Sequence, residues 1–185
     1  MTPLTETLRR FDASQGPKTV GPTDGHYAQL GGCDARFLVW GEESGGTFSL
    51  IEHPIPPHSL CAPLHRHDGV DEYSFVLEGR MGAILGDDVV YAETGDLAFK
   101  PRDQWHTFWN AGDEPCRILE IISPAGFEHY FRELIQLGGP VEADPEALME
   151  LCARYELEMQ PDTVPGLLER FGLRMGEPLS GGWRP

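Results

Sequence analysis

Two histidines and a glutamate stand close together in APLHRHDGVDEYSFVLEG, the segment that covers residues 62–79. One residue, Arg66, separates His65 from His67, so on an extended strand their imidazoles point to the same face. Glu72 has the wrong parity for that face on an unbroken strand, but the DGVD segment at 68–71 is typical of a bend, which resets the parity. Imidazole nitrogens and carboxylate oxygens are ligands for divalent metals. The spacing therefore predicts a metal site rather than a polar strand that happens to carry imidazoles.

A third histidine lies downstream in GDLAFKPRDQWHTFWN, where His106 begins an aromatic strand. Three imidazoles and one carboxylate suit a single divalent ion such as Fe, Mn, Ni or Zn. Tetrahedral zinc bound by all four residues would be closed and structural. Octahedral iron, manganese or nickel would keep two adjacent positions for dioxygen and a chelating substrate. The ligand pattern leaves both chemistries open.

The elements that must position these residues are short strands. From about residue 36 to 123 the chain alternates between apolar runs of strand length and turn residues, which indicates an all-β sandwich or barrel. Helical spacing of apolar residues begins after Ser123 and predicts helices over 126–139 and 144–159, with a shorter one over 164–173. Asp144 suits the N-cap of the second helix and Pro145 its first position. We expect these helices to pack on the outside of the β-domain.

Composition limits the range of partners and compartments. The formal net charge of -16 repels nucleic acid and anionic lipid headgroups, so we expect neither as a partner. The first twenty residues contain no apolar run typical of a signal peptide, and no later run is long enough to span a membrane. The four cysteines are widely spaced, which favours reduced thiols over a disulfide framework. We therefore expect a cytoplasmic protein.

The two histidine segments resemble the two sequence motifs of the cupin superfamily. The residues that fit the first motif are His65, His67, Glu72 and Gly79, with Ser59 at the position of its leading glycine. The residues that fit the second are Gly95, Pro101, His106 and Asn110, with Asp103 in place of its middle glycine. Both departures fall at turn glycines rather than at ligands. We expect Asp103 to adopt the left-handed conformation in the glycine's place.

This resemblance implies a cupin-type antiparallel β-barrel, also described as a double-stranded β-helix or jelly roll, over residues 36–123. Residues 124–185 would form C-terminal α-helices and a tail packed outside the barrel. Residues 1–35 would form an N-terminal arm or edge strand that crosses to a second subunit, which makes a homodimer the expected state.

For function, the chain is similar to single-domain, quercetinase-like cupins. This implies a mononuclear metal-dependent dioxygenase, an oxidoreductase that cleaves a small, oxygen-rich, aromatic substrate of flavonol or polyketide type with dioxygen. His65, His67 and His106 would be neutral ligands, while Glu72 would be a ligand and accept a proton from a substrate hydroxyl. By alternation Phe108 shares the side of His106, so Phe108 is the candidate aromatic contact for the substrate, with core packing as the alternative.

Two other classes of function stay open. A non-redox isomerase, lyase or cyclase would use the metal as a Lewis acid, with a nearby carboxylate or histidine moving protons. His53 and His58 precede the first motif and are candidates for that task, although strand-end or loop exposure is expected for both. The third class is a small-molecule-binding cupin without turnover.

Overall fold

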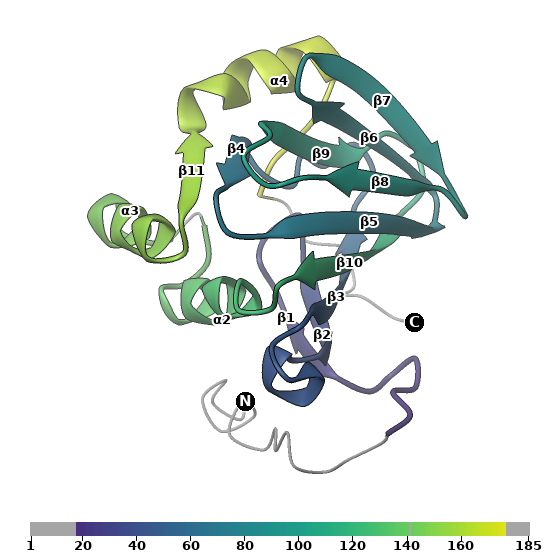
Figure 1. The fold of residues 1–185 in the computed structure, drawn as a ribbon. Helices are drawn as coiled ribbons and strands as arrows, with labels where there is room; N and C mark the ends of the chain where they lie inside the picture. The colour runs from purple at the N-terminus through teal and green to yellow at the C-terminus, as the bar shows by residue number, and fades with distance from the viewer. Residues whose placement is uncertain (1–17, 141, 177–185) are drawn as a thin grey trace.

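The computed structural model describes residues 18–140 and 142–176. Eleven strands make up most of the fold within these described ranges (Figure 1): β1 His26–Ala28, β2 Ala35–Val39, β3 Ser49–Ile55, β4 Leu64–His67, β5 Asp71–Glu78, β6 Arg80–Leu85, β7 Asp88–Glu93, β8 Leu97–Lys100, β9 His106–Asn110, β10 Cys116–Ser123 and β11 Leu157–Gln160. Short 3-10 turns are η2, Gly41–Ser44, and η3, Pro161–Thr163.

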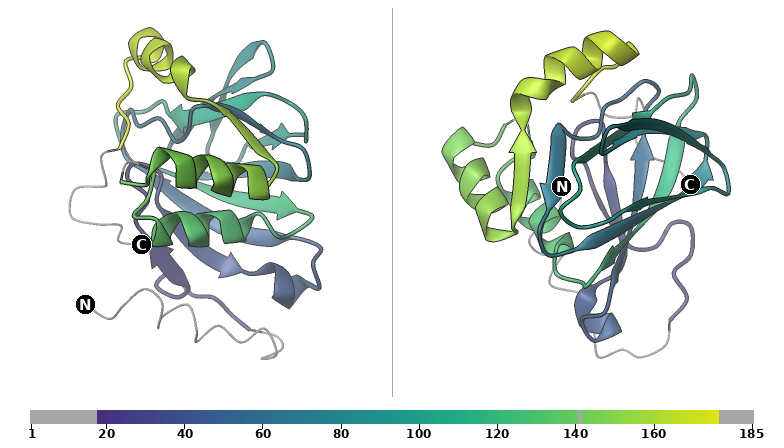
Figure 2. Two further views of the ribbon diagram at one scale, coloured as in Figure 1. Left: turned by 90° about the vertical axis from the view of Figure 1, so that its left-hand side faces the viewer. Right: turned by 45° about the horizontal axis from the view of Figure 1, so that its top comes forward.

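The strands form two antiparallel sheets that curve around a common interior (Figure 2). One sheet has six strands in the order β1-β2-β3-β10-β5-β8, and the other has five in the order β11-β4-β9-β6-β7. Consecutive strands such as β4 and β5 lie in different sheets, so the chain crosses repeatedly between the two walls. This arrangement confirms the predicted all-β jelly-roll barrel.

Residues in the left-handed backbone region make two of the turns. Gly79 joins β5 to β6 with φ of 80°, and a Cβ there would lie 2.9 Å from the Cys116 Cα. Only glycine meets both requirements without strain. Asp103, which replaces a motif glycine, has φ of 62°, so the prediction that it adopts the left-handed conformation is confirmed. The turn before β9 therefore keeps its shape without the glycine.

In the part of the chain that the structure describes, the helices after β10 are α2 Glu128–Gln136, α3 Pro145–Arg154 and α4 Val164–Phe171. Asp144 caps α3 as predicted, since its side chain accepts hydrogen bonds from the Glu146 and Ala147 backbone nitrogens. Helices α2 and α3 lie side by side outside the barrel, and α4 lies above β9 and β6 (Figure 1). No helix in the described ranges is long and apolar enough to cross a membrane.

The prediction of a helix through residue 159 is wrong at its C-terminal end. Helix α3 stops at Arg154, Glu156 takes the left-handed φ of 51°, and Leu157–Gln160 form the strand β11. This strand pairs with β4 along its whole length, placing Leu157 opposite His67 and Met159 opposite His65. Helical spacing reflects only a local preference of the sequence. Here residues 157–160 form backbone hydrogen bonds with the edge of β4, and this pairing outweighs the local preference for helix.

Gly82 of β6 gives a test of how the barrel packs against α4. It lies opposite Trp109 of β9, and a Cβ at Gly82 would come within 2.3 Å of the indole. Trp109 is 1% exposed, and its indole stacks on the Phe171 ring of α4 with the ring centroids 4.4 Å apart. The indole therefore cannot move away from an added Cβ. Gly82→Ala should therefore lower the free energy of unfolding in urea by about 1–3 kcal/mol.

Gly166 of α4 provides the matched control, because a Cβ there meets nothing within 4 Å. Gly166→Ala should leave stability unchanged or raise it by up to about 1 kcal/mol, since alanine is the better helix former. Equal effects of the two substitutions would contradict this account of the packing.

Candidate metal centre

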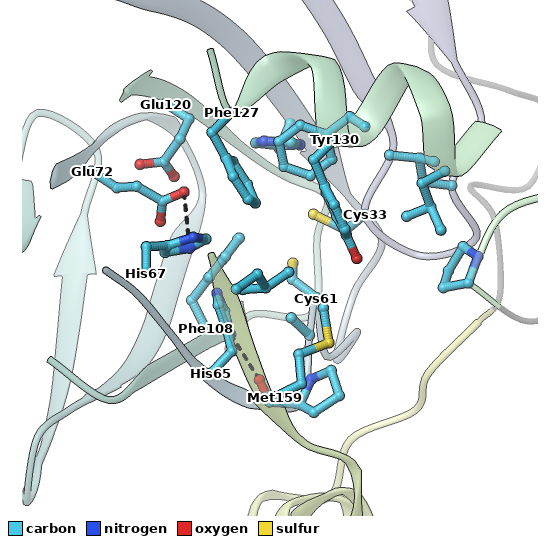
Figure 3. A pocket seen from close by; sticks show the side chains of 18 of the residues that line it. Cys33, Cys61, His65, His67, Glu72, Phe108, Glu120, Phe127, Tyr130 and Met159 are labelled. Atoms are coloured by element: carbon cyan, nitrogen blue, oxygen red, sulfur yellow. Dashed lines mark hydrogen bonds and ion pairs between the residues drawn. The ribbon is translucent and has the colours of Figure 1, made fainter. Parts of the chain in front are cut away.

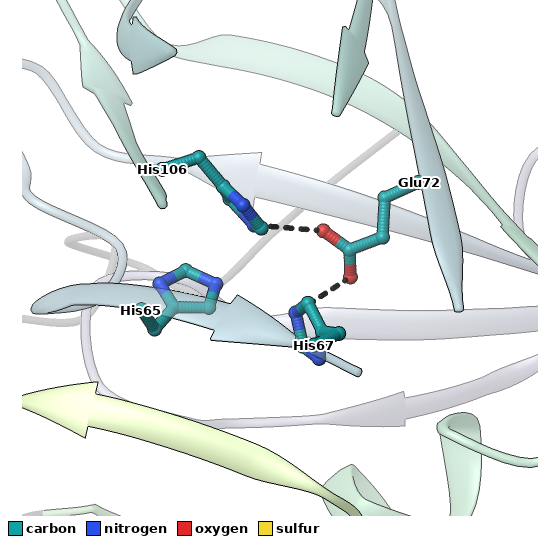
Figure 4. A group of neighbouring side chains, drawn as sticks. All are labelled: His65, His67, Glu72 and His106. Atoms are coloured by element: carbon teal, nitrogen blue, oxygen red, sulfur yellow. Dashed lines mark ion pairs between the residues drawn. The ribbon is translucent and has the colours of Figure 1, made fainter. Parts of the chain in front are cut away.

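Four buried side chains meet inside the barrel near one end. They are His65 and His67 from β4, Glu72 from β5 and His106 from β9, and one ligand atom from each lies within 4.8 Å of the others (Figure 4). These are the four residues that the sequence predicts as metal ligands. They come from three strands, and His106 is far from the other three in the sequence.

Strand pairing explains why they meet. Strands β4 and β9 are paired with His65 directly opposite His106, and the centroids of the two rings are 4.2 Å apart. Period-two alternation then places His67 on the same inner face. The bend at 68–71 carries the chain to the six-stranded sheet, where Glu72 faces the histidines from the opposite wall. The carboxylate therefore completes the group across the barrel rather than along one strand.

Hydrogen bonds orient two of the imidazoles. The Nδ1 of His65 is 2.8 Å from the Pro63 carbonyl oxygen, and the Nδ1 of His106 is 2.9 Å from the Gln104 carbonyl oxygen. A carbonyl oxygen only accepts, so each Nδ1 carries the hydrogen and each Nε2 keeps its lone pair. Such backbone anchoring of the far nitrogen is typical of metal-bound histidines.

The nitrogens that face the interior have no other use in the described part of the chain. The Nε2 atoms of His67 and His106 are buried and lack a hydrogen-bond partner, although they lie 3.5 Å and 3.3 Å from the Glu72 carboxylate. Buried polar atoms without partners are rare and costly. Three imidazoles and a carboxylate converging on one point therefore fit a divalent ion, and these four residues could hold it.

The protonation states also suit a cation. Burial holds the pKa of His65 well below its usual range and lowers that of His67 to about 4, because a charged imidazole loses its hydration there. Burial opposes ionisation of Glu72, yet the adjacent Lys100 ammonium and the imidazoles outweigh it and hold the pKa of Glu72 well below its usual range. Near neutral pH these groups are neutral imidazoles and a carboxylate.

Lys100 and Glu120 extend the site beyond the predicted residues. The Lys100 Nζ is buried between two carboxylates, 2.9 Å from the Glu72 Oε2 and 2.9 Å from the Glu120 Oε2. Burial favours the neutral amine, but the two carboxylates outweigh it and raise the pKa of Lys100. Sequence reasoning missed both residues. Their signal was an inward-facing charge in an apolar strand, since Glu120 has the same parity as the buried Ile118 and Ile122 and shares their inward face.

A cavity of about 290 Å³ opens onto the four-residue group (Figure 3). Its walls are largely apolar and come from the barrel, α2 and β11. The aromatic contributors are Phe108, Phe127, Tyr130 and Phe131, and the aliphatic ones include Leu134, Leu157 and Met159. Phe108 therefore lies where a substrate contact was predicted. No lysine or arginine of the described ranges lines the cavity.

His53 also lines the cavity, which corrects the expectation that it is exposed. It is 2% exposed, and its Nδ1 donates to the Asp34 carbonyl oxygen at 2.9 Å. Burial opposes its protonation, but the Cys33 sulfur and the Glu120 carboxylate outweigh burial and raise the pKa of His53 to about 9. His58, by contrast, lies at the surface with its side chain 40% exposed, and its Nε2 is 2.8 Å from the Asp113 carboxylate.

Comparisons with known proteins agree with this architecture. Residues 52–122 match the family model described as "Cupin domain". A curated relative, the tetracenomycin polyketide synthase protein TcmJ of Streptomyces glaucescens, is 27% identical over 93 residues, which are 50% of this chain and 62% of that protein. The chain thus spans less than two thirds of this relative's length.

Solved structures show similar folds. The polyketide cyclase RemF of Streptomyces resistomycificus is 27% identical with a TM-score of 0.50, over 58% of this chain and 79% of that one. KdgF from Halomonas sp. has a TM-score of 0.54 at 11% identity, over 61% of this chain and 98% of that one. The second likeness concerns the fold alone.

Replacing one of the anchored imidazoles tests the metal centre. His65→Ala or His106→Ala should reduce bound zinc or iron from about one ion per chain to a small fraction, because either change leaves three converging ligands. Elemental analysis of untagged protein after metal loading and gel filtration measures this. His58→Ala removes an exposed histidine outside the group and should keep the full metal content. Full metal content in the His65 or His106 variant would refute the ligand assignment.

Proposed function

The chain carries a cupin domain and belongs to the cupin superfamily, and from this premise we propose that it is a metal-dependent enzyme acting on an aromatic, oxygen-rich molecule of polyketide type. His65, His67, Glu72 and His106 would hold one divalent ion. The ion would polarise a carbonyl or enolate oxygen of the bound substrate. The reaction we favour is a ring closure without an external oxidant.

The chemistry of the cavity carries this proposal. Small anionic substrates, such as a sugar phosphate or oxalate, usually bind in sites that offer lysine or arginine side chains. The described cavity lining offers neither and presents aromatic and aliphatic surface instead. Such a lining suits a neutral, flat molecule that has a few oxygens at one end. Two relatives at 27% identity, TcmJ and RemF, have names that refer to polyketide synthesis or cyclisation.

The residues around the cavity would divide the work of ring closure. Phe108 and Phe127 would flank the substrate, and Phe127 packs against His67 with ring centroids 4.3 Å apart. The apolar lining would exclude water, which strengthens each polar contact with the reacting atoms. His53 would act as the general acid, since its Nδ1 is held by the backbone and its Nε2 is left for Cys33 and the cavity.

In an aldol-type closure, an enolate carbon forms a bond to a ketone carbon, and the ketone oxygen takes up a proton. Loss of that oxygen as water then gives the aromatic ring, and no electron acceptor is needed. His53 would supply the proton to the ketone oxygen. During dehydration the imidazole would take up the hydrogen that leaves carbon, which restores the imidazolium, and the departing hydroxide would leave as water with the proton released to solvent when the enolate formed.

Dioxygenation is the second candidate function, and the donor set is what favours it. Four protein ligands on an octahedral ion leave two positions, enough for dioxygen and one substrate oxygen. Glu72 would then accept the proton of a substrate hydroxyl, as the sequence resemblance implies.

Oxygen consumption separates the two candidates. We expect the metal-loaded protein to convert aromatic poly-β-ketone substrates equally well in the absence and presence of air, with no substrate-dependent uptake at an oxygen electrode. Mass spectrometry should show a product lighter than the substrate by one water. Stoichiometric oxygen uptake, with a product that has gained two oxygen atoms, would instead establish the dioxygenase.

The acid role of His53 predicts a pH dependence. His53→Asn keeps a donor near the Asp34 carbonyl but removes Nε2, so kcat should fall roughly 100-fold with metal content unchanged. Because the pKa of His53 is raised to about 9, wild-type kcat should fall as pH rises through about 9, and the variant should lack this alkaline limb. His58→Asn should match the wild type. A wild-type alkaline limb that persists in His53→Asn would assign the acid to another group.

A further inference from the structure

In the described part of the chain, only one of the two carboxylate oxygens of Glu120 accepts hydrogen bonds. It lies on β10 at a buried position and is 2% exposed. Its Oε2 accepts hydrogen bonds from the Lys100 Nζ at 2.9 Å and from the Ser74 Oγ at 2.8 Å. These two donors, Ser74 of the adjacent strand β5 and Lys100 of β8 beyond it, orient the carboxylate and therefore also Oε1.

The second oxygen of Glu120 has no such partner. Oε1 is buried and lacks any hydrogen bond in the described part of the chain, while Glu120 itself lines the cavity. Figure 3 shows Glu120 beside Glu72, above His67 and next to Phe127. A buried carboxylate oxygen without a donor is costly to maintain, and an ordered water, an ion or a bound molecule can supply the missing partner.

Lys100 explains how this carboxylate can sit so near the candidate metal ligands. One ammonium separates Glu72 from Glu120 and makes a 2.9 Å contact with each. Without it, two buried carboxylates would repel each other and the site would carry excess negative charge. Lys100 is thus a positioning residue, and it leaves Glu120 available as a hydrogen-bond acceptor within reach of a molecule bound at the metal centre.

We propose that Glu120 Oε1 accepts a hydrogen bond from a substrate hydroxyl next to the oxygen that binds the metal. This inference rests on the proposed function and narrows its substrate class. The substrate would be an aromatic ketone with two hydroxyl groups flanking one carbonyl. One hydroxyl and the carbonyl would approach the metal, while the other hydroxyl would donate to Glu120.

A pair of ligand probes tests this directly. The first is an anthraquinone with hydroxyls on both sides of one carbonyl, and the second is its monomethyl ether, which keeps one chelating hydroxyl and carbonyl but has lost the other donor. Dissociation constants are measured by calorimetry on zinc-loaded wild-type protein. The dihydroxy probe should bind roughly 10- to 100-fold more tightly, the range expected for one hydrogen bond to a charged group.

Glu120→Gln should remove most of this preference. Lys100 and Ser74 would hold the amide oxygen in the place of Oε2, which leaves the amide nitrogen, a donor only, in the place of Oε1, while the side chain keeps its size. The matched control is Glu52→Gln, the same exchange at a buried glutamate of β3 that pairs with Arg36 and Arg117 away from the cavity. It should keep the full preference. Zinc content and thermal unfolding of every variant show whether an effect comes from the metal centre or from the fold.

Each outcome decides something different. Equal binding of the two probes by the wild type, or an undiminished preference in Glu120→Gln, would overturn the role of Glu120 while leaving the proposed function standing. Zinc-loaded wild-type protein that binds neither probe would refute the proposed substrate class, and the inference with it. The wild-type comparison of probes needs no variant, so it stays decisive if Glu120→Gln fails to fold.

Discussion

The position of β4 between two antiparallel partners is the constraint on which the site depends. Pairing with β9 sets His65 opposite His106, and pairing with β11 brings Leu157 and Met159 beside the histidines. One short strand therefore assembles three imidazoles and also fixes a wall of the cavity. A register slip of one residue would turn both β4 imidazoles away from the interior, because successive side chains face opposite sides.

Electrostatics impose the second constraint on this barrel. A cluster of imidazoles and two carboxylates occupies a region from which water is largely excluded, and Lys100 is the cation that holds the carboxylates apart. A buried ion pair alone adds little net stability, since desolvation offsets much of the attraction. We therefore attribute this arrangement to function: it keeps Glu72 ionised beside the imidazoles and leaves one oxygen of Glu120, a residue that lines the cavity, without a hydrogen-bond partner in the described part of the chain.

The proposed substrate class rests on the contrast between these polar residues and the walls around them. Glu72, Glu120 and His67 lie together at one side of the cavity (Figure 3), while α2 and β11 supply aromatic and aliphatic surface to its lining. A flat molecule with its oxygens at one end matches this division. This separation of polar and apolar lining is compatible with either ring closure or dioxygenation. Which of the two proposed reactions takes place would depend on the bound metal and on whether His53 delivers a proton.

The sequence by itself determined the features that depend on short-range spacing. Period-two alternation put His65 and His67 on one face, the bend at 68–71 predicted that Glu72 meets them, and Asp103 was expected to be left-handed, as it is. The sequence did not show that Glu72 approaches from the opposite sheet. Only the tertiary structure decided that residues 157–160 form a strand, that His53 is buried, and that Lys100 bridges two carboxylates. Those features depend on pairing between segments far apart in the chain. Strand pairing can override local helical spacing, and a side chain's surroundings are set by whichever strands pack against it.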